Sequence, residues 1–185
     1  MHRLLAPLLV TSCLAARANV VFILPPEQMN FPIPAEEIDA VHRDGDALAK
    51  AAGLAHLRPA GEFELRVWTE SVWSSYQGRG MAYVFEKGRV TAYAIARPDG
   101  HLRAVRRSSR RIAVAQRPVA ALRSAWEVAG RPGCGVADAS IVHVEASLDG
   151  VPIAFSGSDS DALCEDVPDV RTNALLRSVR ALAGH

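Results

Sequence analysis

Five acidic residues lie within the stretch SGSDSDALCEDVPDV, residues 156–170: Asp159, Asp161, Glu165, Asp166 and Asp169. Carboxylates on a loop suit Ca²⁺, which takes about six to eight oxygen ligands. The spacing is not that of an EF-hand, because a loop starting at Asp159 places Cys164 where glycine is required and Val170 where the bidentate glutamate belongs. One hypothesis is therefore an irregular metal site at Asp159, Asp161 and Glu165. The other is an acidic surface loop that leads into a helix.

Cys164 lies among these acids, and the only base near it in the sequence is His143. Neighbouring carboxylates raise the pKa of a thiol, whereas a nucleophilic cysteine needs an electropositive setting. We therefore expect a disulfide between Cys134 and Cys164 rather than a catalytic thiol. The chain has no HExxH, GxSxG, Walker or CxxC motif. We assign no catalytic residue and no cofactor, and a hydrolase or metal-dependent enzyme that uses residues 159–169 and His143 is the alternative.

Charge is segregated along the second half of the chain. Residues 101–126 contain seven arginines and no acid, and residues 132–170 contain eight acids and no lysine or arginine. Such an arrangement suits a protein that docks on an anionic surface, or one that associates head-to-tail with its own kind. The candidate binding residues are two aromatics of a polar loop and four arginines: Trp73, Tyr76, Arg106, Arg107, Arg110 and Arg111. The alternatives are that the aromatics cap the core, and that the two charged segments form neighbouring hairpins whose charges pair across strands.

The N-terminus has the composition of an export signal. Residues 1–18 contain a short basic start, an apolar stretch and Ala16-Arg17-Ala18, which offers small residues before a cleavage site. Within this interpretation, the sequence VTSC resembles the lipobox of bacterial lipoproteins, and Cys13 would then carry a lipid. We expect a periplasmic or secreted protein, or a lipoprotein anchored through Cys13. No membrane-spanning helix is expected in the mature chain, and the oligomeric state is left open.

The remaining pattern predicts the elements that position these residues. Residues 19–61 begin with a proline-rich arm and continue as a helix, broken at Gly45, before a domain over residues 62–185. In that domain, alternating runs flank the turns Lys87-Gly88 and Asp149-Gly150, residues 102–114 suggest a weaker hairpin, and Pro152 marks an edge strand. One amphipathic helix begins after Pro118, before the Asp149-Gly150 hairpin, and a second, capped by Asp169, follows that hairpin.

This order predicts an α+β fold: an antiparallel sheet of about five to seven strands with two helices packed on one face, preceded by the proline-rich arm and a helix. With 185 residues, 49% of them apolar and 22% charged, the chain has the composition of a globular protein and not of a disordered tail. We expect a small exported bacterial envelope protein that acts as a non-catalytic binding module, with a protein or an anionic envelope component as partner. Nucleic acid is not expected, because the basic segment lacks interleaved aromatic residues.

Overall fold

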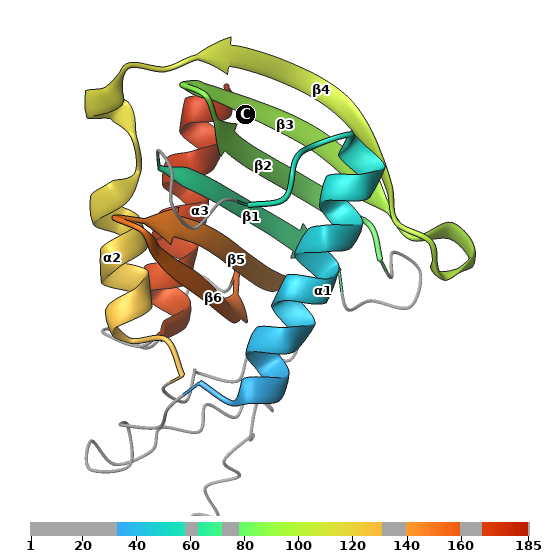
Figure 1. The fold of residues 1–185 in the computed structure, drawn as a ribbon, viewed down its shortest axis with the longest axis horizontal. Coiled ribbons are helices and arrows are strands. Elements are labelled where there is room, and N and C mark those ends of the chain that lie inside the picture. The colour runs from blue at the N-terminus through green and yellow to red at the C-terminus, as the bar shows by residue number, and fades with distance from the viewer. Residues whose placement is uncertain (1–32, 58–62, 72–77, 131–139, 160–167, 185) are drawn as a thin grey trace, which may run out of the picture.

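The computed structural model describes residues 33–57, 63–71, 78–130, 140–159 and 168–184 (Figure 1). Its centre is one antiparallel sheet of six strands in the order β4-β3-β2-β1-β5-β6. The strands are β1 (Glu64–Glu70), β2 (Gly80–Glu86), β3 (Arg89–Ala96), β4 (Arg103–Arg111), β5 (Ile141–Leu148) and β6 (Val151–Ser158). The predicted α+β class and the strand number are confirmed.

Two tight turns build the hairpins β2–β3 and β5–β6. Lys87 and Gly88 have φ values of 49° and 68°, and Asp149 and Gly150 have values of 53° and 78°. Positive φ at both central residues is the requirement of a type I′ turn, whose twist matches that of the strands. Both predicted turns are therefore confirmed. β6 is an edge strand, as the missing N–H of Pro152 indicated.

Helices cover both faces of the sheet. The helices α2 (Val119–Glu127) and α3 (Pro168–Ala183) pack on one face, as predicted, where Leu122, Leu175 and Leu176 join the main apolar core. α1 (Ala35–Ala52) crosses the other face, where Val41 and Leu48 join a second, smaller core (Figure 1). β1 serves both layers because alternate residues point to opposite faces: one set contacts the main core and the other contacts the α1 layer.

Two predictions about the elements are wrong. Residues 103–111 form one strand instead of a hairpin, because β4 pairs along its whole length with β3 and Ser108-Ser109 continues the ladder. α1 is continuous through Gly45, which is buried against the sheet instead of breaking the helix.

The start of α3 also differs from prediction, and one residue each of α2 and α3 stands away from the core. α3 begins at Pro168, so Asp169 lies in its first turn and is not the residue before the helix. Trp126 is 39% exposed at the rim of α2, because Leu122 and Ala125 occupy the side that faces the core. Ala174 is exposed, since Leu175, Leu176 and Val179 fill the space beneath α3.

Candidate functional site

The arginine segment forms a free edge of the sheet. β4 pairs with β3 on one side, and in the described part of the chain it has no strand on its other side. Its five arginines are all exposed, and none of their guanidinium groups forms an ion pair with another described residue: Arg103, Arg106, Arg107, Arg110 and Arg111. The strand therefore carries five exposed positive charges along one edge.

The alternative in which the two charged segments pair their charges across neighbouring strands is wrong for the described residues. The strands β3, β2 and β1 separate β4 from the hairpin β5–β6, which lies at the opposite side of the sheet (Figure 1). One pair does join the segments: Arg123 of α2 donates to Asp149 at the β5–β6 turn over 2.7 Å, and both side chains are exposed. The arginines of β4 take no part in it.

The β4 arginines project from both faces of the sheet. Arg110 lies opposite Val90 on the face of α2 and α3, and Arg106 lies opposite Tyr93 on the face of α1. The register shifts between Ala92 and Tyr93, which leaves Arg107 as the extra residue of a bulge. Burial raises the pKa of Tyr93, and the nearby positive charge of Arg106 opposes that rise. A molecule lying alongside β4 would thus meet positive charge above and below the sheet plane.

A second set of polar side chains lies between α1 and the sheet, and it was not predicted. Arg66 of β1 is 3% exposed and donates to Glu145 of β5 over 3.1 Å. The other oxygen of Glu145, which is 6% exposed, lies 2.9 Å from Nδ1 of His42 on α1. Arg66 also donates to the carbonyl of Ala55, after the helix. Both charges of the buried pair are therefore satisfied, as burial of an ion pair demands.

Gly45 lets α1 lie directly over this pair. A Cβ atom at position 45 would be 2.4 Å from Oε2 of Glu145 and 2.8 Å from its Cδ atom. No side chain fits there unless the carboxylate or the helix moves. The glycine in the middle of the helix is thus explained by the close approach of the buried carboxylate.

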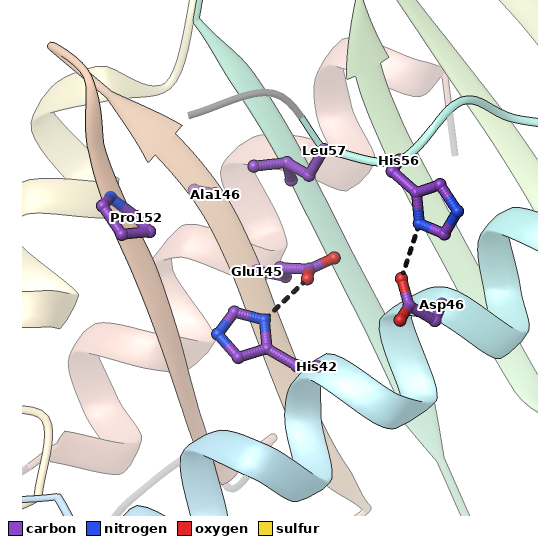
Figure 2. Close-up of a pocket in the computed structure, with 7 residues that line it drawn as sticks. All are labelled: His42, Asp46, His56, Leu57, Glu145, Ala146 and Pro152. Carbon is purple, nitrogen blue, oxygen red and sulfur yellow. Dashed lines mark hydrogen bonds and ion pairs between the residues drawn. The ribbon is translucent and has the colours of Figure 1, made fainter. Parts of the chain in front are cut away.

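A pocket of about 320 Å³ opens beside this network (Figure 2). Its lining comes from α1, the segment after α1, β5 and β6: His42, Asp46, His56, Leu57, Glu145, Ala146 and Pro152. His56 lies 3.0 Å from Asp46, and His42 is held by Glu145, so each imidazole points toward a carboxylate (Figure 2). No group of three or more histidine, cysteine or acidic side chains that could hold a metal ion occurs among the described residues.

His143 is packed into the sheet on the α1 side. Its ring stacks on Trp68 with 5.3 Å between centroids, and its Nδ1 atom lies 3.1 Å from the hydroxyl of Ser156. Burial lowers the pKa of His143, opposed by the negative charges of Glu70 and Asp44. These two carboxylates are themselves paired with Arg97, over 2.7 Å and 3.0 Å. His143 is thus held as a neutral, stacked group.

Of the three predicted metal ligands, only Asp159 is described. Its carboxylate accepts a hydrogen bond of 2.7 Å from the amide of Ser140, and its own amide donates to the carbonyl of Ser140. These two bonds close the end of the β5–β6 hairpin. The remaining predicted features lie outside the described residues: the segment 1–32 with Cys13, Trp73, Tyr76, Cys134, Asp161, Cys164 and Glu165.

None of the helices in the described ranges is long and apolar enough to cross a bilayer. Comparison with protein-family models finds no match for this chain, and comparison with curated proteins finds none either.

Proposed function

We propose that this chain is a small exported protein of the bacterial envelope that acts as a non-catalytic binding module, with β4 as its contact strand. The observation that carries the proposal is the row of five exposed arginines on β4, which the described residues leave without ion-pair partners. A row of like charges along one strand makes a positive potential that attracts an acidic partner.

The partner is an acidic surface or segment. Exposed ion pairs contribute about 0.2–1 kcal/mol each, so several arginines must act together to give useful affinity. Complementary charge also accelerates association and selects against basic competitors. The hydrolase alternative has no comparable support, because His143 is stacked and Asp159 closes a hairpin.

A binding titration tests the charge requirement. The probe is a fluorescent ten-residue peptide in which pairs of glutamates alternate with pairs of valine or threonine residues, so that acids stand at both odd and even positions. We expect the double variant R106Q/R110Q to bind it roughly tenfold more weakly than the unmodified chain, which is about 1.4 kcal/mol and about two thirds of the upper limit of about 2 kcal/mol for two exposed pairs. The matched control R43Q/R79Q removes two exposed arginines elsewhere and should bind normally. Equal affinity of all three proteins would refute the proposal.

Exposed arginines on an edge strand also discourage pairing between copies of a protein. If preventing this self-association were the only role of the arginines, R106Q/R110Q would self-associate without losing affinity for the acidic peptide. Analytical ultracentrifugation of the same variants separates the two roles, because the proposal requires the loss of peptide affinity in monomeric protein.

Export has its own test, which is mass spectrometry of the protein from its native host under non-reducing conditions. We expect a chain that begins at Asn19, or one that carries lipid on Cys13, with Cys134 bonded to Cys164. An unprocessed chain in which Cys134 and Cys164 are both free thiols would refute export and leave the binding proposal to stand on the β4 charges alone.

A further inference from the structure

The outer edge of β4 offers more than charge. Nine residues at about 3.3 Å each make an edge about 30 Å long. Every edge strand presents a row of backbone N–H and C=O groups to a chain that lies beside it. In the described part of the chain no strand pairs with this side of β4. Among these residues, a ladder position for an additional strand is therefore open.

Resting on the proposed function, we propose that the partner is an acidic, extended polypeptide segment that adds to β4 as a seventh strand. Backbone hydrogen bonds along β4 would give the affinity, and acidic side chains opposite the arginines would give the selectivity. Residues directly opposite in a ladder have Cβ atoms about 4.5–5.5 Å apart, close enough for a carboxylate to reach a guanidinium group.

The placement of the arginines favours an added strand over a membrane surface as the binding partner. Arg103 and Arg110 project on the face of α2 and α3, whereas Arg106 and Arg111 project on the face of α1. A planar anionic bilayer that lies against either face of the sheet meets only one of these two sets of arginines, while a strand lying in the sheet plane has side chains on both faces. Val105, which is 58% exposed on the same strand, adds an apolar contact that a β-branched partner residue can cover.

The bulge at Arg107 sets the register of the added strand. Arg103–Arg106 and Ser108–Arg111 are the two uninterrupted halves of β4. A regular strand can pair with each half only if it bends at the bulge. The partner segment therefore needs acids at both odd and even positions, so that one half of its side chains meets each face of the sheet.

Backbone methylation separates strand addition from simple charge attraction. The acidic ten-residue peptide is made in two further forms, each carrying N-methyl groups on one of the two alternate sets of amides. The charge is the same in all three peptides. In a strand, alternate amides point to the same side, so only one set can donate to β4. We expect one methylated peptide to lose at least tenfold in affinity and the other to bind within about threefold of the parent.

Equal affinity of the two methylated peptides, whether retained or lost, would overturn strand addition. If the parent peptide still depended on Arg106 and Arg110, the proposed function would survive that result. Vesicles that contain phosphatidylglycerol give the second arm. Binding to these vesicles with the same arginine dependence, but not to the peptide, would overturn strand addition in favour of a lipid surface. Indifference of every probe to R106Q/R110Q would overturn the proposed function itself.

Discussion

Replacing Gly45 by alanine tests the buried pair beneath α1. In an ordinary exposed helix, this change raises the free energy of unfolding by about 0.5–1 kcal/mol, because alanine restricts the unfolded chain. Here the new Cβ atom would lie 2.4 Å from Oε2 of Glu145. Glu145 is held by Arg66 and His42, so it cannot swing away without losing at least one of these contacts.

The stability lost at the Glu145 carboxylate outweighs the stability gained by replacing glycine with alanine in the helix. A hydrogen bond to a charged group contributes about 1.5–3 kcal/mol. Breaking one such bond and subtracting the helix gain leaves a net destabilisation of about 1–2 kcal/mol for G45A. The substitution E145D shortens the side chain by one methylene and withdraws the carboxylate from α1. In that background G45A should cost less than about 0.5 kcal/mol, or should stabilise the protein.

Guanidinium chloride unfolding of the four proteins of this double-mutant cycle gives the coupling energy. Gly53 supplies the control, because it lies at the end of α1 with φ of 67° and open space around it. G53A should cost about 1 kcal/mol equally with and without E145D. Stabilisation by G45A in the unmodified chain would refute the close approach of Glu145 to the helix.

Further predictions concern the same face of the sheet. Burial lowers the pKa of His143, so the unfolded chain takes up this proton first, and stability should fall as the pH drops below about 6.5 toward the lowered value. H143F, which keeps a ring on Trp68, should show a smaller loss between about pH 7.5 and pH 5 in urea unfolding, and an equal loss would contradict the assignment. R66L should cost about 3–5 kcal/mol in the same assay, because it leaves Glu145 buried without its main partner. R123A removes an exposed pair and should change stability by under about 1 kcal/mol; a cost similar to that of R66L would show that burial does not set these energies.

Local sequence patterns are sufficient to predict most of the elements of the fold. The alternation of apolar residues that predicts a strand also separates its two faces: Leu65 and Val67 lie on one face of β1, and Arg66 and Trp68 lie on the other. The turn at Asp149-Gly150 could be predicted because its backbone geometry depends on the identity of two adjacent residues. The hairpin predicted over residues 102–114 is wrong, because serine is common in turns and only the pairing with β3 keeps Ser108-Ser109 in a strand.

The polar layer under α1 could not be predicted in the same way. Arg66 and Glu145 are 79 positions apart, and their contact depends on β1 lying beside β5. Strand order is a property of the whole sheet, and the sequence around either residue does not indicate it. One signal was present: a glycine within a helical pattern, at Gly45, also indicates close approach of another chain segment. It was interpreted as a helix break.

The contact strand was predictable in composition but not in position. The run of arginines marked residues 103–111 as basic, yet neighbouring charged hairpins and a free charged edge have the same sequence signature. Only the strand order distinguishes these two arrangements, since it puts β4 and β6 at opposite edges of the sheet.

Site-specific photo-crosslinking in the native host tests the central claim most directly. Val105 on β4 and Val151 on β6 are both exposed valines on edge strands, so a photoreactive phenylalanine derivative at either position samples one edge of the sheet. We expect an adduct from position 105 whose partner peptide is rich in acids, little from position 151, and loss of the adduct in R106Q/R110Q. Adducts of equal yield from both positions, or an adduct at position 105 that persists without Arg106 and Arg110, would contradict an arginine-dependent contact at β4.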